Sequence, residues 1–98
     1  MMATIHLTPV GGNVFADLGF PKEEAEMLKI CSSLMMAIRD VIDERELSPA
    51  QAAKVFGVTQ ARIRELLRGK TGEFTLDALV RMLTHAGLQV EINVKAAA

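Results

Sequence analysis

Several residue types are scarce in this chain of 98 residues, and each scarcity excludes a class of protein. The single cysteine, Cys31, rules out an internal disulfide and a Cys-x-x-Cys metal site, and it fits a reducing cytoplasm. No stretch approaches the roughly 18 uncharged apolar residues of a membrane span. Residues 1–16 are uncharged but lack a basic start, and Pro9, Gly11 and Gly12 interrupt them, so we reject a signal peptide.

The sequence also lacks the residue groupings that catalysis and metal binding require. His6 and His85 stand alone, without metal-ligand spacing. Cys31 and Ser32 have no adjacent base to activate a nucleophile. We therefore expect no enzyme activity, no cofactor and no metal.

Aromatic residues are few as well, since tryptophan and tyrosine are absent and only four phenylalanines occur. Half of the residues are nevertheless hydrophobic, which favours helices packed through aliphatic side chains and methionine. At this length we expect a single small all-α domain, a helical bundle whose core is small enough to gain from a second subunit.

The net charge of −1 hides an uneven distribution. Residues 1–46 hold four Lys or Arg against eight Asp or Glu, a net of −4. Residues 54–70 hold five Lys or Arg against Glu65 alone, a net of +4. A basic patch within an acidic molecule is most often a solvated helix face, so its position has to decide its meaning.

Capping residues and hydrophobic spacing mark out four helices. Ser48, Pro49 and Gln51 together form a complete helix start with a capping box, and Gly57 and Gly69 follow the expected helix ends. The predicted helices are 22–46, with a break near Cys31–Ser33, then 49–56, 60–68 and 76–86.

The two ends of the chain differ from this helical middle. Residues 1–21 have no helical period, so we interpret them as an apolar arm that docks on the protein or on a partner, with Thr4–Thr8 as a short extended piece. Residues 88–94 alternate strictly, which predicts a strand. The predicted divisions are an arm (1–21), a helical domain (22–87), a dimerisation strand (88–94) and a tail (95–98).

Two short helices joined at a glycine are typical of a helix-turn-helix, here residues 48–69. Ile63, Leu66 and Leu67 should face the core, which turns Arg64 and Arg68 outward. Arginines on such a face pair with guanine edges and phosphates in a DNA major groove. The basic patch therefore indicates DNA binding rather than a merely solvated face.

The segment "LSPAQAAKVFGVTQARIRELLRGK" resembles the Xre/Cro group of helix-turn-helix regulators. "GEFTLDALVRMLTHAGLQVEI" is similar to the subgroup with HigA-type antitoxins of type II toxin–antitoxin modules, and the resemblance covers about residues 13–94. It implies that Ser48 and Gln51 contact the phosphate backbone of DNA, although Pro49 stands where the family often has a phosphate-binding glutamine. The full predicted DNA-binding set is Ser48, Gln51, Thr59, Gln60, Ala61, Arg62, Arg64, Glu65, Arg68 and Lys70.

The resulting hypothesis is a cytoplasmic, homodimeric repressor, the antitoxin of a module that binds a palindromic operator in its own promoter and neutralises a RelE-like toxin. An unpaired strand is prone to association, so we expect residues 88–94 to pair with a second copy. The alternative pairs them with Thr4–Thr8 of the same chain. Two other functions stay open, a regulator without a toxin and a protein-interaction module. The predicted dimer contacts are Leu88, Val90, Ile92 and Val94.

Overall fold

The computed structural model describes residues 3–7 and 17–96. Four helices make up most of this part of the chain, and a short strand lies at each end of the element order. The elements are β1 (Ala3–Leu7), α2 (Lys22–Glu44), α3 (Pro49–Phe56), α4 (Gln60–Leu67), a 3₁₀ turn η1 (Thr71–Glu73), α5 (Leu76–His85) and β2 (Leu88–Ile92). None of the described helices is long and apolar enough to cross a membrane.

Helix α2 is the longest element, and the break predicted near Cys31–Ser33 is wrong. The helix runs through this segment without interruption. The Ser33 hydroxyl donates a hydrogen bond of 3.0 Å to the Lys29 carbonyl one turn earlier, so a polar side chain is accommodated within the helix. The helix ends two residues earlier than predicted, and Glu46 just after it has a positive φ of 51°.

The other three helices begin where the sequence predicts, each at a hydroxyl residue. Ser48, Thr59 and Thr75 accept hydrogen bonds from the backbone N–H three residues later, which stabilises each first turn. Helix α3 ends at Gly57, whose φ of 68° is left-handed. Helices α4 and α5 each end one residue earlier than predicted, at Leu67 and His85.

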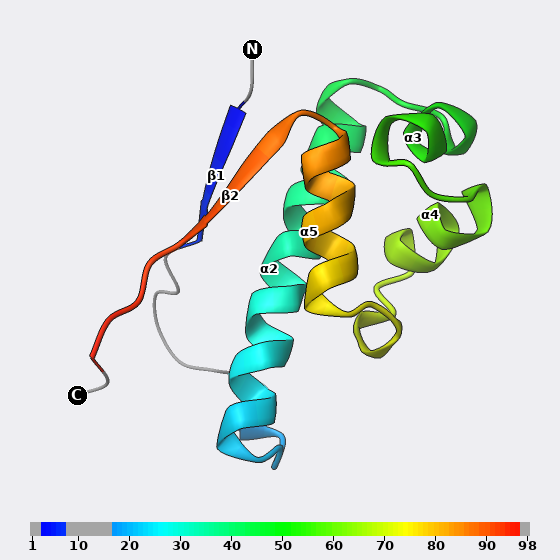
Figure 1. Ribbon diagram of the computed structural model, residues 1–98. Coiled ribbons are helices and arrows are strands. Elements are labelled where there is room, and N and C mark those ends of the chain that lie inside the picture. The colour runs from blue at the N-terminus through cyan, green and yellow to red at the C-terminus, as the bar shows by residue number, and fades with distance from the viewer. Residues whose placement is uncertain (1–2, 8–16, 97–98) are drawn as a thin grey trace.

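The helices enclose one hydrophobic core. Figure 1 shows α2 and α5 side by side in the middle of the molecule, with α3 and α4 on one side and the strands on the other. Leu34 and Ile38 of α2 are fully buried against Ile63 of α4 and Leu79 of α5. This packing confirms an all-α helix-turn-helix fold, in which α3 packs against α4 and α5, and α4 also contacts α2.

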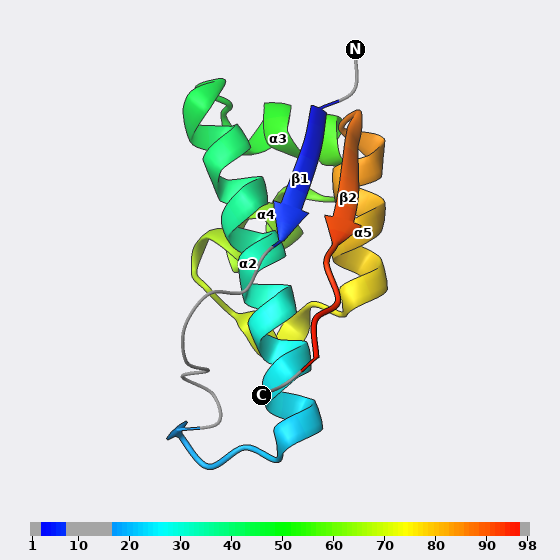
Figure 2. The same ribbon diagram turned by 90° about the vertical axis from the view of Figure 1, so that its left-hand side faces the viewer.

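The C-terminal strand has a partner within its own chain. The dimer was expected on the premise that this strand is unpaired, and that premise is wrong. Strand β2 pairs in parallel with β1 of the same chain, in a register that sets Ala3 opposite Leu88 and Leu7 opposite Ile92. Figure 2 shows the two strands side by side over the helices. An extended segment of the same chain can pair without the entropic cost of bringing two molecules together. The arm is therefore not wholly irregular, although Thr8 and residues 9–16 lie outside the described residues.

Candidate nucleic-acid interface

The turn between α3 and α4 is closed by a direct approach of α5 to the backbone. A Cβ atom placed on Gly57 would lie 2.8 Å from Cδ2 of His85, closer than real Cβ atoms come to a neighbour. The His85 ring is held there by a 2.9 Å hydrogen bond between its Nδ1 and the Val55 carbonyl oxygen. This histidine, which the sequence left as an isolated residue, thus connects the end of α5 to the end of α3 beside the turn.

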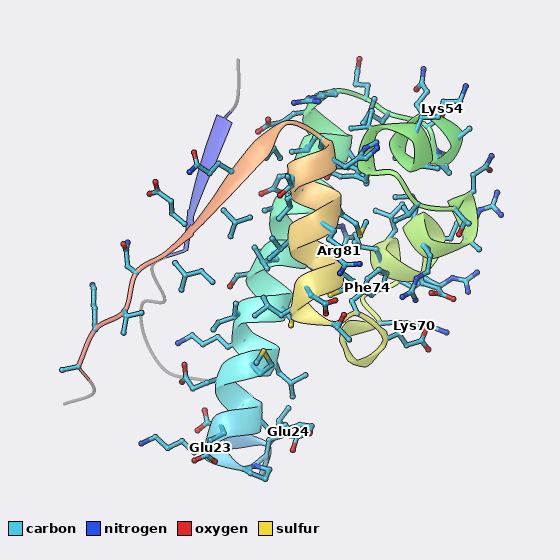
Figure 3. All side chains as sticks on the ribbon, in the orientation of Figure 1. Glu23, Glu24, Lys54, Lys70, Phe74 and Arg81 are labelled. Atoms are coloured by element: carbon cyan, nitrogen blue, oxygen red, sulfur yellow. The ribbon has the colours of Figure 1, made fainter. Side chains whose placement is uncertain are left out.

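Helix α4 presents a buried face and a polar face. Ile63 and Leu66 are buried, and Leu67 is half-buried. On the other side Gln60, Ala61, Arg64 and Arg68 are exposed, as their spacing predicts. Lys54 and Lys70 are exposed as well, and Figure 3 shows both on the outer side of the helix-turn-helix. Arg64, Arg68, Lys54 and Lys70 therefore all lie on the exposed side of the helix-turn-helix.

The caps of α3 and α4 occupy some of the predicted phosphate-contacting atoms but leave their donors. The backbone N–H of Ser48 donates to Gln51 Oε1 at 2.9 Å, and the Gln51 N–H donates to Ser48 Oγ at 3.2 Å. Thr59 Oγ1 accepts from the Arg62 N–H at 3.2 Å. The side chains of Ser48, Gln51 and Thr59 each use an oxygen for capping. The side-chain NH₂ of Gln51 and the hydroxyl hydrogens of Ser48 and Thr59 can therefore still donate to a phosphate.

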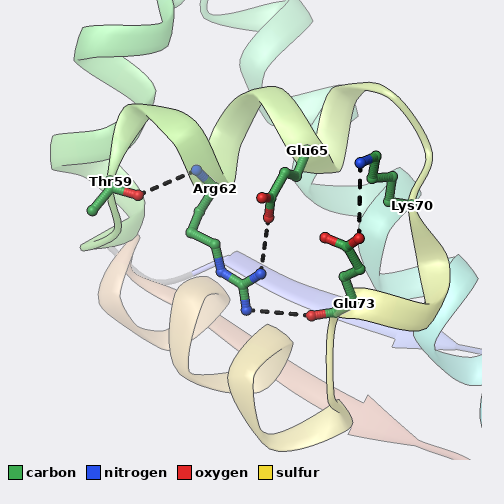
Figure 4. A network of polar contacts seen from close by, with 5 residues as sticks. All are labelled: Thr59, Arg62, Glu65, Lys70 and Glu73. Carbon is green, nitrogen blue, oxygen red and sulfur yellow. Dashed lines mark hydrogen bonds and ion pairs between the residues drawn. The ribbon is translucent and has the colours of Figure 1, made fainter.

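Arg62 differs from the other predicted DNA contacts, because its guanidinium is engaged within the protein. Nη1 donates to Glu65 Oε2 at 2.9 Å, and Nη2 donates to the Glu73 carbonyl oxygen at 3.3 Å. The guanidinium carbon lies 4.6 Å from the centre of the Phe74 ring. Figure 4 shows the polar contacts of Arg62 with Glu65 and Glu73. Arg62 and Glu65 are therefore partners of each other, which a reading of one helix face did not reveal.

Lys70 lies at the edge of the same network. Its Nζ is 3.8 Å from Glu73 Oε1, and both side chains are about half exposed, so the pair is long and solvated. Such an ion pair contributes little to stability, and the lysine keeps most of its attraction for a phosphate. Arg64 and Arg68 have no ion pair within the described part of the chain.

The residues predicted to form a dimer interface fall into two groups. Leu88 is buried and Val90 is half-buried against the protein's own core. Ile92 is 43% exposed and Val94, beyond the strand, is 93% exposed. Only the second pair is accessible to another molecule in this structure.

The comparisons with known proteins agree with this geometry. Residues 14–95, most of the chain, match the family described as a helix-turn-helix domain. No curated protein matches the sequence. In helix-turn-helix domains the second helix of the motif, here α4, is the one that enters the DNA major groove. The chain belongs to the helix-turn-helix domain family and has the architecture of a DNA-binding regulator.

Proposed function

We propose that the protein is a homodimeric transcriptional repressor that reads a palindromic operator with α4, and that it is the antitoxin of a type II toxin–antitoxin module. The observation that carries the DNA-binding part is the exposed face of α4, where Gln60, Ala61, Arg64 and Arg68 stand opposite the buried Ile63 and Leu66. Its cations meet a groove that is lined with phosphates and guanine edges.

The exposed residues of α4 divide by their position along the helix. Gln60 and Ala61 lie in the first turn and Arg64 begins the second, on the part of the helix nearest its N-terminus that contacts base edges in helix-turn-helix complexes, so they are the proposed base contacts. Arg68 caps the far end and, with Lys54 and Lys70, is suited to the phosphates on either side of the groove.

A dimer accounts for the apolar residues left exposed at the end of β2. Among the described residues the sheet has two strands, so β2 has a second edge besides the one that pairs with β1. Antiparallel pairing of this edge with a second copy would cover Ile92 and Val94, which are now exposed. Two recognition helices about 34–36 Å apart would then meet successive turns of DNA.

A toxin partner is supported by an apolar groove with an acidic rim. The groove measures about 450 Å³ and lies between the first half of α2, η1 and the start of α5. Met27 in its wall is half exposed, and Glu24 and Asp77 line it. A hydrogen bond from the Thr75 side chain lowers the pKa of Asp77. Figure 3 shows Glu23 and Glu24 well away from Lys54 and Lys70, so a basic ribonuclease bound here would leave α4 accessible.

The DNA-binding proposal is tested by selecting duplexes from a random pool with the full-length protein and then comparing Arg64→Ala with Arg68→Ala. If Arg64 reads a guanine, its loss should cost about 1–3 kcal/mol and relax selection at that base pair. Loss of Arg68 should weaken operator and random DNA alike and make the salt dependence less steep by about one. Equal losses on both DNAs for both variants would contradict the role given to Arg64.

The remaining alternatives are separated by other measurements. A protein-interaction module would bind duplexes weakly and would enrich no sequence. A regulator without a toxin would bind its operator but would have no toxin-sized reading frame of about 100 residues beside its gene. Where such a neighbour exists, its product should bind the wild-type protein and lose affinity for Met27→Glu, which places a charge in the apolar groove.

A further inference from the structure

Helix α4 is too short to fix its own orientation. It has eight residues, about two turns, and helices of this length are marginal in isolation. Ile63 and Leu66 hold one side on the core, with Leu67 half-buried beside them, but aliphatic contacts on one side tolerate a small roll about the helix axis. The exposed arginines amplify any such roll, because their guanidinium groups stand far from the axis. Specific reading of DNA therefore needs a polar contact that fixes the roll.

Arg62 supplies such a contact on the flank of α4. Its backbone N–H is tied to the Thr59 cap, and its side chain reaches the Glu73 carbonyl, eleven positions further along the chain. The planar guanidinium lies against the Phe74 ring at 4.6 Å, and Phe74 is buried. One side chain thus connects the first turn of the recognition helix to the segment that leads into α5.

Glu65 completes the arrangement from the second turn of the same helix. Its carboxylate accepts from Arg62 Nη1 at 2.9 Å, and the two side chains are 31% and 41% exposed. A charge-assisted hydrogen bond of this length orients the guanidinium toward Glu73. The pairing also neutralises the one acid among the five cations of residues 54–70, which would otherwise repel phosphates.

We propose that Arg62 is a positioning residue for DNA recognition: through Glu65, the Glu73 carbonyl and the Phe74 ring it fixes the roll of α4, and it contacts neither base nor phosphate. Arg64 and its neighbours read the sequence from the orientation that Arg62 sets. This inference rests on the proposed operator binding and assigns a different role to Arg62 and Glu65 from that of direct DNA contacts.

The deciding experiment compares Arg62→Lys with the matched change Arg64→Lys in the full-length protein. Lysine keeps the charge but lacks the planar fork that serves Glu65, Glu73 and the ring together. For Arg62→Lys we expect the preference for operator over random DNA to fall about tenfold, equivalent to about 1.4 kcal/mol. Its affinity for random DNA should stay within about twofold, because Arg62 makes no phosphate contact that the change could weaken.

Repeating the selection with each variant shows how the lost preference is distributed. Arg62→Lys should weaken selection at every base pair that α4 reads, whereas Arg64→Lys should weaken it at one. Glu65→Ala should likewise weaken selection at every base pair that α4 reads. The double variant Phe74→Leu with Arg62→Lys should lose less preference for the operator than the sum of the losses in the two single variants. Circular dichroism and thermal unfolding of each variant establish that the fold is retained, and Glu65→Ala provides the same test if Arg62→Lys does not fold.

Three results would overturn the inference. They are an equal loss on operator and random DNA for Arg62→Lys, a loss at a single base pair for Arg62→Lys or Glu65→Ala, and no loss for Arg62→Lys. The first would make Arg62 a phosphate contact, and the second would make it or Glu65 a base reader. If the wild-type protein itself enriches no sequence, the proposed function fails instead, and that outcome is seen before any variant is made.

Discussion

The helix-turn-helix and the two-stranded sheet are stabilised by interactions of very different range. In the helix-turn-helix, the first turn of each helix is capped by a hydroxyl oxygen that accepts a hydrogen bond from the backbone N–H three residues later. In the sheet, Ala3 pairs with Leu88, from nearly the opposite end of the chain. A helix cap depends only on residues that are neighbours in the sequence. The pairing of β1 with β2 depends on how the whole helical domain brings two distant segments together. The stability of the two regions should therefore respond to different changes.

The largest effect should follow removal of residues 1–7. This deletion takes away β1 and its hydrogen bonds to β2, and it leaves that edge of β2 unpaired. With about 0.5–1.5 kcal/mol net for each lost hydrogen bond, we expect the free energy of unfolding to fall by about 2–4 kcal/mol. Urea unfolding followed by circular dichroism measures the loss, and the helical signal before unfolding should change little.

The same deletion also tests the proposed dimer. If β2 pairs with a second copy through its other edge, the shortened protein should still sediment as a dimer at micromolar concentration. A second truncation, ending at Ala86, removes β2 and should give a monomer. An unchanged midpoint of urea unfolding after deletion of residues 1–7 would show that β1 contributes nothing to the fold in solution.

These contrasting regions also explain how far the sequence alone could go. The bounds of α3, α4 and α5 were predicted to within one residue, because Ser48, Thr59 and Thr75 mark each start locally. The exposed face of α4 followed from its helical period. The break in α2 was wrong, because polarity near Ser33 looks like an interruption until its hydrogen bond to Lys29 is known.

The pairing of β2 with β1 and the contacts of Arg62 could not be predicted from local sequence patterns, and the reason is the same for both. Alternation predicted β2 but carries no information about what lies beside it, and pairing with β1 was only the lesser alternative. In the same way the helical period placed Arg62 on a flank, but the Glu73 carbonyl and the Phe74 ring come from a loop whose path depends on tertiary packing. Long-range contacts of this kind require the structure.

A smaller loss of stability is expected when either of two glycines with the same backbone conformation is replaced by alanine, and the loss should differ between them. Gly57 and Gly69 have positive φ angles of 68° and 75°, but only Gly57 has a neighbour where a Cβ would stand. Gly69→Ala should therefore cost only left-handed strain, about 1 kcal/mol. Gly57→Ala should cost about 2–3 kcal/mol, because His85 must move and its hydrogen bond to Val55 weakens.

The measurement is thermal or urea unfolding of both variants, with the same two substitutions repeated in a His85→Ala background. Without the imidazole ring the clash disappears, so the two glycine changes should become nearly equal in cost. If Gly57→Ala remains the more costly change in that background, a contact other than His85 makes Gly57 necessary.

The smallest effect should come from removing one hydroxyl at a helix start and comparing it with one inside a helix. Ser48→Ala deletes the acceptor for the Gln51 N–H and breaks the capping box, which should destabilise the protein by about 1 kcal/mol. Ser33→Ala deletes a hydroxyl that only bonds back to Lys29 within α2, where alanine is the better helix former, so its effect should be close to zero. Urea unfolding of the two variants under the same conditions gives the difference. Equal stabilities would mean that α3 is held by its packing on the core through Ala52 and Phe56 rather than by its cap, and the helix-turn-helix would then depend on long-range contacts as much as the sheet does.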